Sequence, residues 1–214
     1  MALRPLSKID HLLLGVDKAL RAVVPHSNPS TRPLPVSSDD IPELSITESR
    51  HVAGLMRINH TGEVCAQGLY HGQAFTAKDN NVKQAMQQSA EEEVDHLVWC
   101  ETRLSELGSH PSVFTPLWYG MSFGLGAVAG AISNEFSMGF VAETEAQVSE
   151  HLQDHIGQLP PQDQRSKEIL AQMDSEELHH RELALANGGA ALSPLMRHTM
   201  RWMANRMKAT AYHF

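Results

Sequence analysis

The chain has 214 residues and a formal net charge of −8, from 17 Lys and Arg against 25 Asp and Glu. That length suits one domain with a large core, alone or with a short appendage. The acidic balance, without a clustered basic domain, argues against nucleic acid as the main partner. The two cysteines, Cys65 and Cys100, form no Cys-x-x-Cys motif and lie in helical patterns. We therefore expect reduced core residues in a protein on the cytosolic side.

Two segments precede the main domain. Residues 6–24 have the apolar spacing of a short amphipathic helix, and we assign residues 1–24 to this element. Its apolar run, residues 12–14, is short and lacks a small-residue cleavage site, so it does not predict a secretory signal. Residues 25–44 are rich in Pro and Ser and predict an extended linker before the main domain, residues 45–214.

The first core helix is predicted to begin near Ser45 or Thr47, where Ser45 and Glu48 match a capping box. A stripe at helical spacing then marks the inward face, and Glu63 stands in it where an apolar residue is expected. Gly62 costs about 1 kcal/mol relative to Ala in a helix, which is tolerable if a neighbour approaches closely there. The stripe contains Val52, Leu55, Met56, Asn59, Glu63, Ala66, Tyr70 and Ala74.

The second core helix, residues 82–107, has no Gly or Pro. Glu93 and His96 lie in its inward stripe, and at i and i+3 both side chains leave the same side of the helix. A buried carboxylate beside an imidazole is costly unless a cation or a hydrogen-bond partner compensates it. The pair therefore predicts a metal ligand set.

Residues 116–132 are almost wholly apolar and rich in Gly. A membrane span needs about 20 apolar residues, so this run predicts a helix packed closely on a neighbour through small residues, with an apolar outer surface. A nucleotide-binding loop at residues 124–130 is disfavoured because no strand precedes it.

The second pair of core helices is predicted at residues 134–159 and 162–186. Glu145 lies in the inward stripe of the first, and the second offers either Glu177 with His180 or Glu176 with His179. The apolar residues Leu170, Met173 and Ala184 are in line with Glu177 and His180, which favours that pair.

A last helix, residues 193–212, interleaves apolar and basic residues. This pattern suits a membrane interface, and it suits equally a packing helix with a solvated basic face. Taken with segments 6–24 and 116–132, it favours peripheral membrane attachment.

The spacing of the Glu-x-x-His pairs carries more information than their number. Glu63 lies 30 residues before Glu93, and Glu145 lies 32 before Glu177, with a chain breaker midway in each half. A helix that rises about 15 residues, turns and descends equally brings both sites to one height, roughly 22 Å below the turn. Two such hairpins form the ligand set of ferritin-like di-iron carboxylate bundles. Roughly one pair is expected by chance, and four occur: Glu48/His51, Glu93/His96, Glu176/His179 and Glu177/His180.

We therefore predict an all-α, ferritin-like four-helix bundle with an apolar crossover helix and a C-terminal amphipathic helix. Four carboxylates and two imidazoles without sulfur suit two Fe(II), or Mn, rather than structural zinc. Whether Glu63 and Glu145 are terminal or bridging ligands stays open. The predicted ligands are Glu63, Glu93, His96, Glu145, Glu177 and His180, with Glu92, Asp95, Asp174, Glu176, Tyr70 and His151 as candidate partners around them.

Four runs of sequence resemble the demethoxyubiquinone hydroxylase family of ubiquinone biosynthesis: residues 59–63 (NHTGE), 92–96 (EEVDH), 143–151 (ETEAQVSEH) and 176–180 (EELHH). The resemblance covers about residues 45–214 and implies the same six metal ligands. Some members have a Tyr one position after the matched His151, where this chain has Leu152. Any role of that Tyr cannot be transferred.

The resemblance implies a di-iron monooxygenase that uses O2 to hydroxylate the ring of 2-polyprenyl-3-methyl-6-methoxy-1,4-benzoquinol. It implies two Fe ions, NADH as an external reductant, and other ubiquinone-biosynthesis proteins as partners. We expect a peripheral protein on the cytoplasmic side of the cell membrane, or on the matrix face of the inner membrane if mitochondrial. Tail length, immediate electron donor and oligomeric state are left open.

Three other interpretations compete with this one. A ferritin-like iron oxidase or storage protein would share the ligands, but it should present soluble outer surfaces, which segment 116–132 does not. A helical scaffold in a lipid-biosynthesis complex would bind no iron. A bundle with metal-free Glu–His pairs would leave excess negative charge uncompensated.

Overall fold

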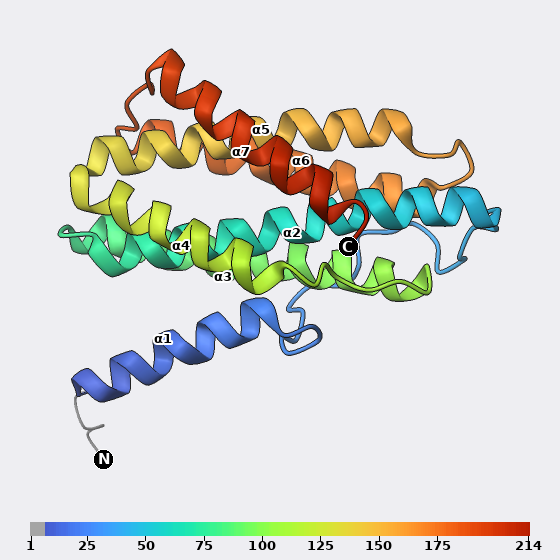
Figure 1. Ribbon diagram of the computed structural model, residues 1–214, viewed down its shortest axis with the longest axis horizontal. Coiled ribbons are helices and arrows are strands. Elements are labelled where there is room, and N and C mark those ends of the chain that lie inside the picture. The colour runs from blue at the N-terminus through green and yellow to red at the C-terminus, as the bar shows by residue number, and fades with distance from the viewer. Residues whose placement is uncertain (1–6) are drawn as a thin grey trace.

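The structure is a computed structural model that describes residues 7–214, and every regular element in that range is a helix. Figure 1 shows their arrangement. The first six residues of the predicted N-terminal segment lie outside the described range. The helices are α1 (Lys8–Val23), α2 (Ile46–Thr76), α3 (Asn80–Glu106), α4 (Thr115–Ile132), α5 (Asn134–Gln158), α6 (Gln164–Ala186) and α7 (Pro194–Ala211).

Two hairpins, α2–α3 and α5–α6, form a four-helix bundle, and α4 crosses from one hairpin to the other (Figure 1). Both hairpin turns fall on the predicted chain breakers, at residues 77–79 and 159–163. Ser45 caps α2 through the predicted capping box with Glu48. The all-helical, ferritin-like bundle is thus confirmed. Because each hairpin has arms of nearly equal length, residues about 15 positions from each turn meet at mid-height.

The bundle interior consists of two apolar clusters. One, at the end where α2 begins, contains Val52, Met56 and Cys100, while the other contains Tyr70, Met86 and further side chains from α5 and α6. The predicted metal ligands lie between these clusters along the helices. The apolar clusters therefore hold the four helices together on both sides of a polar centre.

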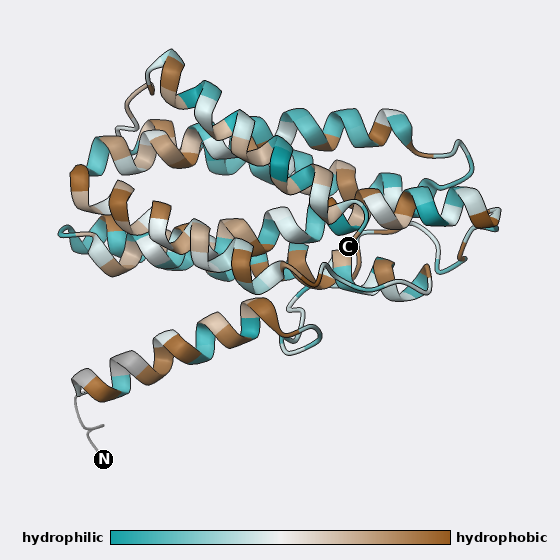
Figure 2. Cartoon of the chain, viewed as in Figure 1, coloured by the Kyte–Doolittle hydropathy of each residue, from teal (hydrophilic) through white to brown (hydrophobic). Residues whose placement is uncertain are grey.

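Helix α4 packs closely on α2, as its small residues predicted. A Cβ on Gly126 would overlap the carbonyl oxygen of Leu69, and one on Gly72 would overlap that of Phe123. The outer side of α4 is apolar, and in Figure 2 the helix is brown to white along most of its length. Its exposed large apolar residues recur at helical spacing: Leu117, Met121, Leu125, Val128 and Ile132. No helix among the described residues is long and apolar enough to span a membrane.

The two N-terminal segments attach to the bundle differently. Helix α1 is packed near its C-terminal end, where Ala22 contacts Val64 and Tyr119, and its other end extends away from the bundle (Figure 1). Residues 25–44 contain no helix or strand, as predicted, but they lie against the bundle. Leu34 and Val36 pack on its first apolar cluster. The linker is therefore extended and docked.

Candidate metal centre

The six predicted ligands come from all four bundle helices and are buried in its middle. Each is at most 7% exposed: Glu63 on α2, Glu93 and His96 on α3, Glu145 on α5, and Glu177 and His180 on α6. One ligand atom from each of Glu63, Glu93, His96 and Glu177 lies within 4.8 Å of the others. The structure thus brings together residues that are up to 117 positions apart in the sequence, from 63 to 180.

Glu93 lies between the two imidazoles. Its Oε2 is 2.7 Å from Nδ1 of His96, and its Oε1 is 2.8 Å from Nδ1 of His180. Despite these distances, none of the four atoms has a hydrogen-bond partner of acceptable geometry. Buried polar atoms without a partner are rare, and a bound ion is one explanation for them. The close grouping of carboxylate oxygens and imidazole nitrogens fits bound metal cations.

The remaining carboxylates complete the cluster. Oε1 of Glu177 is 3.3 Å from Nδ1 of His96, and Oε2 of Glu63 is 3.8 Å from the same atom. Glu145 lies beside Glu177, and its Oε1 accepts a short hydrogen bond from the hydroxyl of Tyr70. Glu93 and Glu177 therefore stand in the centre of the group.

Several groups of the cluster have raised pKa values and so keep their protons to higher pH. Burial raises the pKa of Glu63 and of Glu177 to about 7, and raises that of Glu145 well above its usual value. Burial alone would lower the pKa of His180, but the neighbouring Glu93 raises it to about 9. Metal binding replaces such protons, so this environment fits a site that exchanges protons for cations.

Each imidazole is oriented by a carboxylate on its far side. Nε2 of His96 is 2.7 Å from Oε2 of Glu176, and Nε2 of His180 is 3.0 Å from Oε2 of Glu92. A histidine that donates from one ring nitrogen presents the lone pair of the other to a metal. Both rings therefore direct Nδ1 to the cluster, and Glu92, Glu176 and Tyr70 are partners of the ligands, as predicted.

The other three candidate partners do not contact the ligands. Asp95 is hydrogen-bonded to the linker, Asp174 accepts from Ser149, and His151 donates to the backbone of Gln147. These residues lie within a turn or two of a ligand, but their side chains point elsewhere. A position within a turn or two of a predicted ligand therefore did not predict side-chain contact with that ligand.

The choice between the two frames on α6 is also clear. Glu177 is 1% exposed and lies in the cluster, whereas Glu176 lies on the outer side of His96, and His179 is exposed. The predicted pair Glu177 and His180 is thus the one that faces the other ligands.

Sequence reasoning missed Arg32. This linker residue donates two hydrogen bonds to Glu176, at 2.6 and 2.9 Å, and one to Asp95 at 2.7 Å. Apart from His26, it is the only basic residue in residues 25–44. No periodicity marks it, so the sequence alone offers no signal for this contact.

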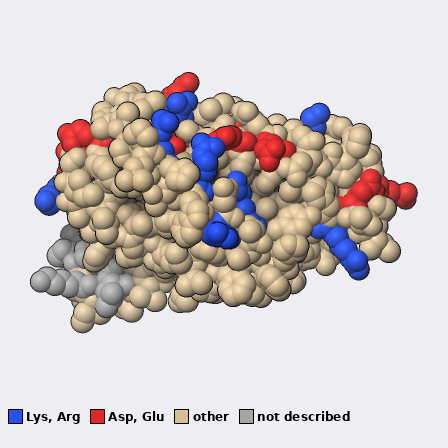
Figure 3. Space-filling model, turned by 45° about the horizontal axis from the view of Figure 1, so that its top comes forward, with Lys and Arg blue, Asp and Glu red and all other residues tan. Residues whose placement is uncertain are grey.

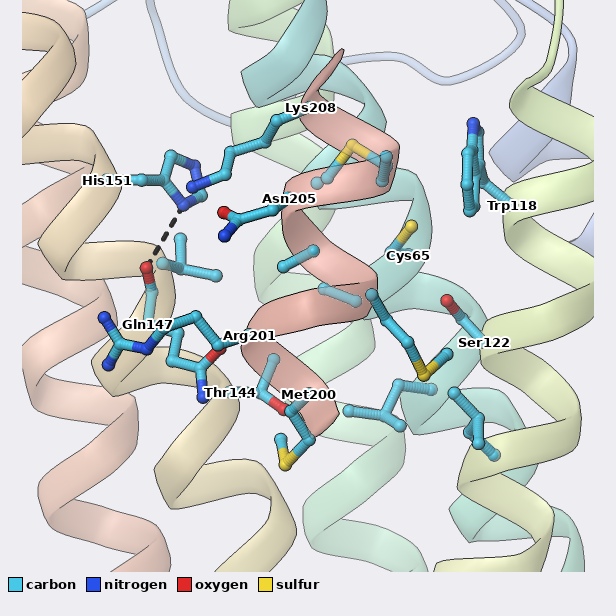
Figure 4. A pocket seen from close by; sticks show the side chains of 18 of the residues that line it. Cys65, Trp118, Ser122, Thr144, Gln147, His151, Met200, Arg201, Asn205 and Lys208 are labelled. Atoms are coloured by element: carbon cyan, nitrogen blue, oxygen red, sulfur yellow. Dashed lines mark hydrogen bonds between the residues drawn. The ribbon is translucent and has the colours of Figure 1, made fainter. Parts of the chain in front are cut away.

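A cavity of about 490 Å³ opens between α2, α4, α5 and α7 (Figure 4). Gly62 and Ala66 on α2 line it, as does Thr144 on α5, so it follows the helical turns that carry Glu63 and Glu145. A Cβ added at Gly62 would meet no described atom within 4 Å, so a close helix approach does not account for this glycine. Most of the wall is apolar and rich in Met; its polar side chains include His151, Asn205 and Lys208.

Comparisons with known proteins agree with this picture. The family model described as ubiquinone biosynthesis protein COQ7 matches residues 50–211. A protein of Psychrobacter cryohalolentis is 97% identical over 214 residues, the whole of both chains, and one of Acinetobacter baumannii is 53% identical over 99% of this chain and 100% of its own. Both are named 3-demethoxyubiquinol 3-hydroxylase.

Among solved structures, a dodecameric thioferritin, a bacterioferritin-related protein from Bacteroides fragilis, matches with a TM-score of 0.54. It is 16% identical and the match covers 67% of this chain and 86% of that one, so it supports the ferritin-like fold alone. The family match and the identity to its relatives confirm the resemblance seen in the sequence. This chain belongs to the ubiquinone biosynthesis protein COQ7 family.

Proposed function

We propose that this chain acts as a 3-demethoxyubiquinol 3-hydroxylase, the activity for which its relatives are named. In this reaction the ring of a polyprenylated methoxy-methyl-benzoquinol gains one oxygen atom from O2, and the second oxygen leaves as water. Two electrons per turnover come from a reductant outside the chain, for which we propose NADH. The observation that carries the proposal is the buried group of carboxylates and imidazoles, in which one ligand atom each of Glu63, Glu93, His96 and Glu177 lies within 4.8 Å of the others.

The proposed cofactor is a pair of iron ions. Oxygen and imidazole nitrogen donors without sulfur suit such a pair in a ferritin-like bundle, and the ions when bound supply O2 activation. Four carboxylates balance two divalent charges, which makes burial tolerable. Glu93 is close to both imidazoles, whereas Glu177 lies near His96 and Glu145. All six residues would hold the ions, with Glu63 near His96 and Glu145 near His180.

The cavity is the proposed place of the quinol ring. Burial lowers the pKa of His151 to about 3, so its imidazole is neutral at physiological pH. Its Nδ1 donates to the carbonyl of Gln147, the dashed line in Figure 4, which leaves Nε2 as an acceptor. A neutral imidazole with one free acceptor suits a quinol hydroxyl. The apolar remainder of the wall suits the ring and the first part of an isoprenoid tail and excludes water from the reacting groups.

We also propose peripheral attachment to the cytoplasmic side of the cell membrane, where a substrate with a long isoprenoid tail resides. Outside the grey atoms, few charged side chains lie along the lower part of the face in Figure 3, and Figure 1 shows α1 and α4 in the lower half of the molecule. Exposed apolar side chains on that side include Leu13 on α1 and Val128 on α4. Such surfaces suit an interface with lipid acyl chains.

Sedimentation with phosphatidylethanolamine–phosphatidylglycerol vesicles tests the attachment. We expect Val128→Glu to weaken vesicle binding severalfold, because it places a charge in the apolar stripe of α4. Leu183→Glu, at an exposed apolar residue of α6, serves as the matched control and should bind like the unchanged protein. Equal binding by all three proteins would contradict the assignment of this face.

The activity is tested by giving anaerobically reduced, iron-loaded protein a demethoxyubiquinol and isotopically heavy O2. Mass spectrometry should find one heavy oxygen atom in the quinol product and the other in water. Two bound iron ions per chain without any hydroxylated product would contradict the proposal. Iron oxidation with mineral formation in place of product would favour the storage protein instead.

A further inference from the structure

One residue of the linker, Arg32, contacts Glu176, the carboxylate partner of His96. Arg32 lies outside every helix, yet its guanidinium joins α3 to α6. Nη1 and Nη2 donate to the two carboxylate oxygens of Glu176, at 2.6 and 2.9 Å, and Nε donates to Asp95 at 2.7 Å. Oε2 of Glu176 is at the same time 2.7 Å from Nε2 of His96. A continuous chain of contacts therefore runs from the linker to a predicted metal ligand.

Arg32 is itself held in place by its surroundings. The backbone N–H and the hydroxyl of Thr31, together with the hydroxyl of Ser30, donate to Asp95 at 2.7 to 2.9 Å. The guanidinium carbon of Arg32 lies 4.7 Å from the centre of the Trp99 ring. A planar guanidinium with two parallel hydrogen bonds to one carboxylate fixes the orientation of that carboxylate as well as its charge.

The other half of the centre has no such support. Glu92 occupies the equivalent position beside His180, but its side chain is 43% exposed. Its second oxygen accepts only from Gln88, one turn earlier on the same helix. Glu176 is 22% exposed and bonded on both oxygens by Arg32. The carboxylate that orients His96 is thus more buried and accepts more hydrogen bonds than the one that orients His180.

We propose that Arg32 is a positioning residue for His96, and that it makes the metal position beside His96 the tighter of the two. By holding the carboxylate of Glu176 against Nε2, Arg32 keeps Nδ1 directed at the metal position. The partner of His180 has more freedom, so that ring loses more conformational entropy when it binds a cation. This inference rests on the proposed metal centre.

Cobalt(II) titration of the metal-free, full-length protein tests the inference. Calorimetry and the visible absorption of bound cobalt should resolve two steps per chain, the tighter one on the His96 side. Loss of a carboxylate partner of a ligating histidine costs about 10- to 100-fold in metal affinity. We expect Arg32→Ala to weaken the tighter step by about tenfold or more, and to leave the weaker step within about twofold. Arg32→Lys keeps the charge without the paired hydrogen bonds and should be intermediate.

Arg165 provides a matched control. It also ties the linker to the bundle, through the carbonyl of Ser38 and the carboxylate of Glu106, but it does not contact the centre. Arg165→Ala should lower the melting temperature and leave both cobalt affinities unchanged.

Two results would overturn the role of Arg32. One is that Arg32→Ala leaves both cobalt affinities unchanged. The other is that Arg165→Ala weakens cobalt binding as much as Arg32→Ala does, which would mean that docking of the linker, rather than Arg32 itself, sets the affinity. A wild-type protein that binds no cobalt would instead overturn the metal centre, and with it both proposals.

Discussion

Removal of the metal should reverse the dependence of stability on pH between pH 7 and 9. In the metal-free protein, Glu93 raises the pKa of His180 from 6.5 to about 9, although burial alone would lower it. A group with a raised folded-state pKa adds stability that is fully present below its unfolded-state pKa and is lost as the pH rises through the folded value. The metal-free protein should therefore lose stability from pH 7 to pH 9. His96, whose pKa is also raised by Glu93 and its other carboxylate neighbours against the effect of burial, acts in the same direction.

The size of the effect follows from His180. Each pKa unit is worth about 1.4 kcal/mol, so a folded-state pKa near 9 gives a loss of about 2 kcal/mol between pH 7 and pH 9. For a domain of this length, 1 kcal/mol shifts the melting temperature by about 2–4 °C. We expect the melting temperature to fall by roughly 4–8 °C. The buried histidines with lowered pKa values, such as His151, are neutral in both states above pH 7 and do not contribute.

With iron or cobalt bound, the sign changes, because a metal requires the deprotonated ligands and binds more tightly as the pH rises. Thermal denaturation of metal-free and loaded protein at several pH values between 7 and 9 measures both slopes. His180→Gln should flatten the metal-free slope, and His179→Gln, at its exposed neighbour, should leave it as it is. Parallel curves for the metal-free and loaded proteins would refute the reasoning.

Substitutions at five residues test other parts of the structure. Glu177→Ala should abolish hydroxylation and metal loading in a folded bundle. Glu176→Ala should lower metal affinity by about 10- to 100-fold, and excess iron should restore its activity. Iron analysis and product formation measure the effect of each substitution. Tyr70→Phe removes the hydroxyl that bonds a cluster carboxylate and should weaken cobalt binding by about tenfold. Gly126→Leu should lower stability by about 3 kcal/mol or more in thermal denaturation, because α2 and α4 must separate. Gly120→Ala, where a Cβ meets open space, should raise it by up to about 1 kcal/mol.

The bundle, and the burial of the predicted ligand residues at its centre, were predictable because the helical repeat and the spacing of the hairpin arms agree. Helical spacing places Glu93 and His96 on one face, and a turn midway between Glu63 and Glu93 places those two at one height. The apolar frame on α6 then selects Glu177 over its neighbour. These inferences need only helical geometry and the free-energy cost of burying charge, and residue spacing and residue type are enough to apply both.

The surroundings of α2 could not be predicted in this way. One inward stripe was expected, but residues on its other sides are buried as well, among them Arg57 and Gln67. Arg57 donates to the carbonyls of His110 and Tyr212, and Gln67 donates to that of Ala90. A polar side chain satisfied by a distant carbonyl has the same sequence pattern as one in water. Burial of that kind depends on tertiary partners that periodicity does not reveal.

The same limit explains why the two halves of the centre appeared equivalent. The ligand pattern repeats from one hairpin to the other, and the repeat alone predicts two similar metal positions. Arg32 lies outside that repeat, 63 residues from Asp95 and 144 from Glu176, and it contacts only the half that contains His96. The linker, whose composition predicts only that it forms no helix, thus makes the two halves of the site different. If this is how the protein works, the first metal ion bound should occupy the position beside His96, and the order of filling should depend on a residue that no ligand motif contains.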